Sequence, residues 1–122
     1  MFDGSDLDAA ERFVDDWQAG IEQRAAQARD LAARLAGLTA AARSDDGFIT
    51  VTVGPDGAMT GLELDEEVRR KPAAQTARQI LSTLAAARAD LTTQATTVTE
   101  ETVGADSETG KAVIASLTRR QP

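Results

Sequence analysis

The chain of 122 residues contains neither cysteine nor histidine, two residue types that carry much of protein chemistry. The absence of cysteine excludes disulfides, thiol nucleophiles and cysteine-ligated zinc. The absence of histidine removes the commonest general base and the commonest transition-metal ligand. The chain also has no GxGxxG motif and no P-loop. These absences predict a protein that is not an enzyme and that uses no cofactor and no metal.

Aromatic residues and long apolar runs are also scarce. Aromatics make up 3% of the chain, whereas hydrophobic residues make up 42%, so the core must consist mostly of Ala, Leu, Val and Ile. No apolar run approaches the ~18 residues that a membrane span requires. No signal-peptide pattern opens the chain, so the expected location is the cytoplasm, with no membrane partner.

Charge alternates in blocks along the chain, within a net charge of −7. A chain that is acidic overall repels polyanions such as DNA, unless a local basic patch is repeated by oligomerisation. The acidic blocks are residues 1–22 (−6), 44–68 (−7) and 89–110 (−5), and the basic blocks are residues 23–43 (+3), 69–88 (+5) and 111–122 (+3).

The first periodic segment, Ser5 to Leu38, predicts a long amphipathic helix. At 1.5 Å per residue it would be ~50 Å long, too long to be covered by a small domain, so part of it must meet another helix from this chain or a second copy. Arg24 interrupts the apolar positions, either with its stem packed and its head in water or in a salt bridge or phosphate contact. The apolar positions follow heptad spacing: Val14, Trp17, Ile21, Ala28, Leu31, Leu35 and Leu38.

Two strands follow, Phe48–Val53 and Ala58–Leu64, joined by the turn Gly54–Gly57. Alternation places Ile49, Val51 and Val53 on one face, which we expect to pack on the helices. Residues 39–44 lead into a turn and predict either a third strand or, from their alanines, a continued helix.

Pro72 suits the first position of a second long helix. Six threonines between residues 92 and 102 predict that this helix frays after Leu91. Residues 1–104 are expected to form one domain, and residues 105–122 a polar tail that either forms a short helix or stays mobile. We expect six apolar residues of the two helices to be buried in the domain or in a dimer interface: Trp17, Ile21, Leu31, Leu35, Leu84 and Leu91.

The glycine-bounded strand Asp46–Gly54, followed by Gly57 and by Leu62-Glu63-Leu64-Asp65, gives the chain a family resemblance. Over roughly residues 5–100 the chain resembles the YbaB/EbfC family of bacterial nucleoid-associated proteins. The resemblance implies an α+β fold with a long N-terminal helix, a three-stranded antiparallel sheet and a second long helix. It also implies a homodimer that binds DNA with little sequence preference, without catalysis or cofactor.

One feature departs from the family pattern. DNA contact is attributed in the family to projecting helical arms, whereas the corresponding segments here, residues 1–22 and 89–110, are acidic. A DNA site would have to lie nearer the sheet, and the run Arg69–Lys71 is either such a site or a solvated connector. Acidic arms also fit an alternative function, a dimeric adaptor or chaperone that binds a protein partner, as in relatives linked to specialised secretion. The candidate DNA-binding residues are Arg34, Arg43, Arg69, Arg70, Lys71 and Arg78.

Overall fold

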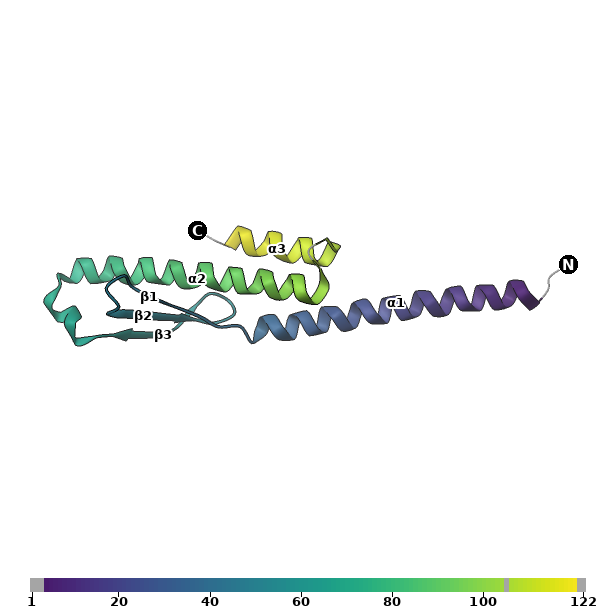
Figure 1. Ribbon diagram of the computed structural model, residues 1–122, viewed down its shortest axis with the longest axis horizontal. Coiled ribbons are helices and arrows are strands. Elements are labelled where there is room, and N and C mark those ends of the chain that lie inside the picture. Colours follow the sequence, from purple (N-terminus) through teal and green to yellow (C-terminus); the bar gives the residue numbers. More distant parts are fainter. Residues whose placement is uncertain (1–3, 105, 121–122) are drawn as a thin grey trace.

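The computed structural model describes residues 4–104 and 106–120, and its elements run along one long axis (Figure 1). The predicted order of helix, three-stranded antiparallel sheet and second long helix is confirmed. The predicted tail includes residues 105, 121 and 122, which lie outside the described residues. The elements are α1 (Gly4–Ala36), β1 (Ala40–Arg43), β2 (Ile49–Val53), β3 (Met59–Leu64), the 3-10 helix η1 (Glu66–Arg70), α2 (Ala73–Val103) and α3 (Glu108–Arg120).

The sheet has the order β1-β2-β3, with both pairs antiparallel and β2 in the centre. Residues 40–43 form a strand, so the alternative of a continued helix is excluded. Gly47 and Gly57 adopt φ values of +78° and +82° in the two hairpin turns, a conformation in which glycine avoids the steric cost of a Cβ. Turn chemistry therefore fixes the register of all three strands.

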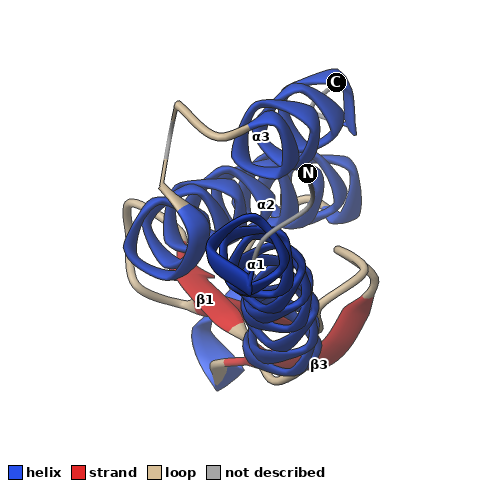
Figure 2. Ribbon diagram, turned by 90° about the vertical axis from the view of Figure 1, so that its right-hand side faces the viewer, coloured by secondary structure: helices blue, strands red, loops and turns tan. Residues whose placement is uncertain are grey.

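The core lies between the sheet and α2. Ile49, Val51 and Val53 are fully buried, which confirms the predicted facing of β2. From α2, Ala87 and Leu91 join the same cluster, together with Ala40 of β1. The layers are the sheet, then α2, then α3 on the far side of α2 (Figure 2).

The helix α2 continues without interruption to Val103, so the predicted fraying after Leu91 is wrong. The hydroxyl groups of Thr92, Thr93 and Thr99 each donate a hydrogen bond to the carbonyl oxygen four residues earlier. These bonds satisfy the hydroxyls within the helix, and Thr99 is completely buried. Tertiary packing therefore outweighs the weak helix propensity of threonine in this segment.

The predicted apolar tail segment forms α3, which packs on α2 (Figure 1). Ser107 Oγ accepts a hydrogen bond from the backbone N–H of Gly110 at 2.9 Å and donates one to Gly104 O at 3.0 Å. A Cβ at Gly110 would overlap the carbonyl oxygen of Gly104, so glycine is needed for this close turn between helices.

The two halves of α1 have different surroundings. The second half packs along α2, where Leu31 is buried and Leu35 is half-buried. The N-terminal half extends beyond α2 and α3 as a free-standing helix (Figure 1), which we call the arm, residues 4–22. Trp17 and Ile21, on this arm, are 61% and 42% exposed within the single chain. Of the other residues expected to be buried, Leu91 is buried and Leu84 is half-buried.

On the face of the sheet that packs against α2, the side chains of β3 are left uncovered. Leu62 pairs with Val51 and Leu64 with Ile49, so these β3 side chains share the face that α2 covers. However, α2 lies over β1 and β2. On α2, Arg88 Nε donates to Gly57 O at 2.8 Å, so this side of the helix faces the β2–β3 turn. Leu81, two turns earlier, lies on the same side and is 66% exposed. We call the exposed set Met59, Leu62, Leu64 and Leu81 the open face.

Candidate nucleic-acid interface

The fold separates one of the six predicted basic residues from the other five. Arg34 lies in the last turn of α1, before β1 begins. The others lie around the opposite end of the sheet, where β1 ends, η1 follows β3, and α2 begins (Figure 1). We call Arg43, Arg69, Arg70, Lys71 and Arg78 the basic end.

Arg69 and Arg70 are the most accessible cations of the run that the sequence singled out. Their side chains are 79% and 81% exposed, and each pairs with an acid of the same short helix: Arg69 with Glu66 at 3.0 Å, Arg70 with Glu67 at 3.5 Å. Exposed ion pairs of this kind contribute only about 0–1 kcal/mol to stability. Both guanidinium groups can therefore exchange their intramolecular partner for a phosphate at little cost.

Lys71 differs from these two neighbours because its ammonium group is already engaged. It forms an ion pair with Asp46, donates to Gln79 Oε1 at 2.8 Å and lies 5.1 Å from the centroid of the Phe48 ring. Its side chain is only 15% exposed. Lys71 therefore ties the β1–β2 turn to the start of α2, and it contributes little surface to an incoming phosphate.

Asp46 is the centre of this network. One of its carboxylate oxygens accepts hydrogen bonds from Ser44 Oγ at 2.6 Å and from the backbone N–H of Phe48 at 3.0 Å. The other accepts from Lys71 and from Gln79 Nε2, the latter at 3.0 Å. The Lys71 ammonium, followed by the Ser44 and Phe48 donors, holds the pKa of the Asp46 carboxyl well below its usual range. Asp46 thus stays ionised throughout the neutral pH range.

The other three candidate arginines differ in the contacts that their side chains make with the rest of the chain. Arg43 Nη2 donates to Gly47 O at 3.0 Å and so braces the turn that follows its own strand. Arg34 pairs with Asp30 at 3.3 Å, one turn away on α1, with both side chains about half exposed. Arg78 is exposed on the second turn of α2. Arg69, Arg70 and Arg78 are therefore the best placed to contact phosphates.

Acids are interspersed among these bases, because two oppositely charged sequence blocks meet at this end of the sheet. Asp45 and Asp46 lie in the β1–β2 turn, and Asp65, Glu66 and Glu67 lie in and beside η1. A single chain therefore presents a surface of both charges here, with individual arginine side chains lying among carboxylates. The sequence showed that residues 69–88 hold five bases and no acid, but it could not show which acids of other segments lie beside them after folding.

Sequence reasoning missed Asp46 and Gln79 as the partners of Lys71. They lie 25 residues before it and 8 residues after it in the chain. Ser44, Asp46 and Gly47 are recognisable as turn residues, but nothing in their spacing indicates that a lysine closes the turn from outside. From the sequence alone the three cations of the run are therefore equivalent candidates, whereas in the fold Lys71 has a structural role.

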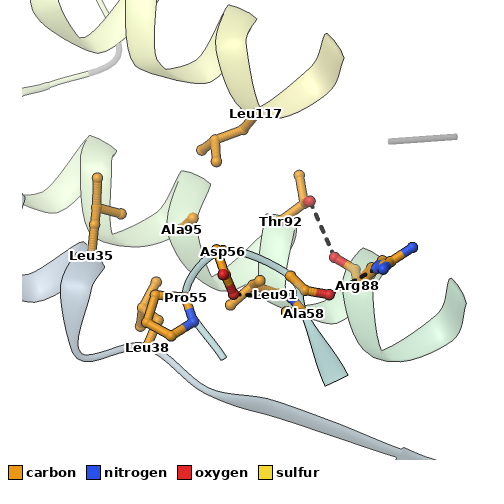
Figure 3. Close-up of a pocket in the computed structure, with 11 residues that line it drawn as sticks. Leu35, Leu38, Pro55, Asp56, Ala58, Arg88, Leu91, Thr92, Ala95 and Leu117 are labelled. Carbon is orange, nitrogen blue, oxygen red and sulfur yellow. Dashed lines mark hydrogen bonds between the residues drawn. The ribbon is translucent and has the colours of Figure 1, made fainter. Parts of the chain in front are cut away.

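A cavity of about 380 Å³ is lined by residues of α1, α2, α3 and the β2–β3 turn (Figure 3). Apolar residues from α1, α2 and α3 line it, and Leu117 points into it from α3. Its charged groups are engaged: Arg88 holds Gly57 O, and Asp56 Oδ1 accepts from the backbone N–H of Ala58 at 3.0 Å. The cavity therefore offers packing space without a constellation of groups suited to catalysis. The lining residues are Leu35, Leu38, Pro55, Asp56, Gly57, Ala58, Arg88, Leu91, Thr92, Ala95 and Leu117.

A model of the YbaB/EbfC DNA-binding family matches residues 14–106, from the arm through the sheet and the whole of α2. The chain belongs to the YbaB/EbfC DNA-binding family. Its membership makes this a protein of the DNA-binding, nucleoid-associated type. Neither a search of curated proteins nor a search of solved structures returned a match.

This YbaB/EbfC protein has a helix beyond the matched region. Helix α3 begins at Glu108, beyond the residues that the family model matches, so its packing on α2 is an addition to the matched region. Within residues 4–104 and 106–120, none of the helices combines the length and the apolar character needed to cross a membrane.

Proposed function

We propose that this YbaB/EbfC protein is a homodimer that binds duplex DNA with little sequence preference, in the cytoplasm and at the nucleoid. The family match over residues 14–106 is the observation that carries the proposal. Cys and His are absent from the chain, which supports a role in binding rather than in catalysis.

The two-copy state is supported by the apolar surface of the single chain. Exposed large hydrophobic side chains gather on the arm and on the open face, and monomeric soluble proteins rarely leave contiguous surface of this kind in water. A second copy would cover it. Dimerisation would also bring two basic ends into one particle, which is how an acidic chain can hold a polyanion locally.

Arg69, Arg70 and Arg78 are proposed as the principal phosphate contacts, with Arg43 and Arg34 further from the centre of the contact. Lys71 supports the site by fixing the β1–β2 turn against α2 rather than by touching DNA. Arginine at an exposed position can bind a phosphate oxygen pair in bidentate fashion. Such contacts do not read base edges, so weak discrimination between sequences follows.

A charge-removal experiment tests this site. The triple variant Arg69→Ala, Arg70→Ala, Arg78→Ala is compared with the control Arg12→Ala, Arg29→Ala, Lys111→Ala, which removes the same charge from exposed positions of α1 and α3. Retention of a duplex in a gel-shift assay should fall at least tenfold more for the first variant than for the control. Equal losses of duplex retention in the two variants would show that binding depends only on net charge, which would refute the proposed site.

A second candidate function has one specific observation in its favour. Phe13, Val14 and Trp17 lie exposed on an arm that carries six acids and one base, a surface unsuited to DNA. This favours an adaptor or chaperone dimer whose arms hold a protein partner. If wild-type protein retains no duplex at low salt, the adaptor function replaces the first proposal, and a pull-down with the intact arm becomes the next measurement.

A further inference from the structure

The cavity bordered by α1, α2, α3 and the β2–β3 turn has the size and lining of a small-molecule site. Its volume of about 380 Å³ lies in the range of about 300–1,000 Å³ that is typical of such sites. An apolar cavity of about 150 Å³ already holds a benzene ring. We propose that this cavity binds a free α-amino acid with a large apolar side chain. The inference goes beyond the proposed function and does not depend on DNA binding.

The apolar part of the cavity suits the side chain of such a ligand. It is lined from three helices and from the segment after α1, and Leu117 points into it from α3 (Figure 3). Leu35, Leu38 and Leu117 are each half-buried, so their side chains keep apolar surface that a ligand can cover. Burial of an apolar body against this surface favours binding. The apolar lining from the helices and this segment is Leu35, Leu38, Leu91, Ala95 and Leu117.

Three polar side chains complete the lining, and two of them are charged. Thr92 Oγ1 donates to Arg88 O at 3.1 Å, so its proton is used within α2. Arg88 and Asp56 carry opposite charges and line the same cavity, yet they form no ion pair with each other. The cavity therefore offers one cationic and one anionic group that do not neutralise each other directly.

Each charged group uses one atom to hold the β2–β3 turn. Arg88 donates to Gly57 O through Nε at 2.8 Å, and its two Nη groups have no partner among residues 4–104 and 106–120. Asp56 Oδ1 accepts from the backbone N–H of Ala58 at 3.0 Å, and Oδ2 has no partner within the same residues. Gly57 directly follows Asp56, so the Nε contact fixes the guanidinium beside the turn that carries the carboxylate.

This pair of open groups selects a ligand that carries both charges. The two Nη groups of Arg88 can donate in parallel to a carboxylate, and Asp56 Oδ2 can accept from an ammonium group. A ligand with a carboxylate alone would place it near Asp56 without compensation, and a ligand with an amine alone would meet Arg88. An α-amino acid carries both charged groups and its side chain on one carbon atom, so a single molecule matches the charged pair and the apolar lining.

Helix α3 makes this site a property of the chain beyond the region that the family model matches. Leu117 lies on α3, which begins after residue 106, where the match ends. The turn before α3 is well defined, because Ser107 Oγ bridges Gly104 O and the N–H of Gly110. A Cβ at position 110 would overlap the Gly104 carbonyl oxygen. This turn therefore fixes the α3 wall of the cavity.

Calorimetric titration of the full chain with L-phenylalanine, in the absence of DNA, tests the site. Saturable binding with a Kd of about 1 mM or tighter is expected, given the size of the ligand. L-Alanine has the same charged groups without the ring, and it should bind at least tenfold more weakly. No saturable binding of L-phenylalanine up to about 10 mM, or equal binding of the two amino acids, would overturn the proposal.

Two substitutions combined with ligand analogues test the charged pair. Arg88→Gln keeps a donor for Gly57 O but removes the cation, and Asp56→Asn keeps an acceptor for the Ala58 N–H but removes the anion. Each should weaken L-phenylalanine binding at least tenfold. Arg88→Gln should not weaken binding of phenylalaninamide, which lacks the carboxylate, and Asp56→Asn should not weaken binding of N-acetylphenylalanine, which lacks the ammonium group. Equal losses for L-phenylalanine and the analogue would limit these residues to shaping the cavity, which would overturn the assigned recognition.

A cavity-filling substitution tests the location. Leu117→Trp places a larger side chain where Leu117 points into the cavity, whereas the control Ala115→Trp adds the same side chain at an exposed position of α3. Binding of L-phenylalanine should fall at least tenfold in the first variant and stay at the wild-type level in the second. Circular dichroism checks that both variants keep their helices. Wild-type binding by a folded Leu117→Trp variant would show that the ligand lies elsewhere and would overturn the site.

Discussion

The two halves of α1 carry the same apolar pattern but differ in what covers them. In the second half, which packs along α2, Leu31 is buried. In the arm, Val14, Trp17 and Ile21 are exposed at the same helical spacing. The difference shows that a heptad pattern specifies which face of a helix is to be buried, but not which molecule buries it. Here one helix contributes to the intrachain core at one end and leaves the same apolar face exposed at the other.

The largest expected effect comes from the covered half. Leu31→Ala should lower the free energy of unfolding by ~2–5 kcal/mol, because it removes a buried side chain and leaves a cavity. Val14→Ala in the arm, measured at concentrations low enough for a monomer, should change it by less than about 0.5 kcal/mol. Urea unfolding followed by circular dichroism checks both. Similar losses in the two variants would mean that the halves of α1 do not differ in burial within the chain.

The arm should show its effect in association rather than in folding. Trp17→Ala is expected to weaken self-association at least tenfold, or about 1.4 kcal/mol, since large aromatic side chains dominate interface energies. Sedimentation equilibrium over a range of concentrations measures the change. Wild-type association by the variant would show that the exposed apolar face of the arm is not an interface.

A smaller and pH-dependent effect on stability is expected at the end of the sheet opposite the arm. There Asp46, paired with Lys71, fixes the β1–β2 turn, and we call this contact the clamp. The pKa of Asp46 is lowered in the fold, so the stability it contributes is complete above the unfolded value of about 3.9 and is lost as the pH falls below that value. Asp46→Asn should therefore lower the melting temperature at pH 7, with a difference from wild type that narrows below about pH 4.

The neighbouring Asp45→Asn variant is the matched control for this clamp, because it removes the same charge from an exposed position of the same turn. It should melt close to the wild type at both pH values. Trp17-dependent association should be unchanged in both variants, since the clamp lies at the opposite end of the molecule from the arm (Figure 1). A clamp variant that dissociates the dimer would instead couple the two ends.

Local patterns in the sequence were sufficient for most of the fold. Strict alternation placed Ile49, Val51 and Val53 on the buried face, and the glycine turns gave the hairpin. The family resemblance favoured a strand at residues 39–44, whose alanines by themselves also suit a helix, and the structure forms it at Ala40–Arg43. The persistence of α2 beyond Leu91 was not predictable from propensity, because buried contacts and hydroxyl-to-carbonyl bonds stabilise a threonine-rich helix.

The candidate site was less predictable for a physical reason. Consecutive residues of one run, Arg70 and Lys71, have opposite environments, one on the surface and one largely enclosed. The difference depends on Asp46 and Gln79, which only the tertiary fold brings to Lys71. Charge blocks in a sequence report local composition, whereas a binding surface depends on how those blocks are interleaved after folding.

The central claim is that this acidic chain binds DNA through exposed arginines. The most direct test is a titration of wild-type protein with two duplexes of unrelated sequence at about 50 and 200 mM salt. Each phosphate contact contributes a slope of ~0.9 to the log–log salt dependence of the binding constant. Contacts from Arg69, Arg70 and Arg78 in both copies predict a slope of about −5, the same for both duplexes. Absence of binding to either duplex at about 50 mM salt, or a binding constant that salt leaves unchanged, would contradict the claim.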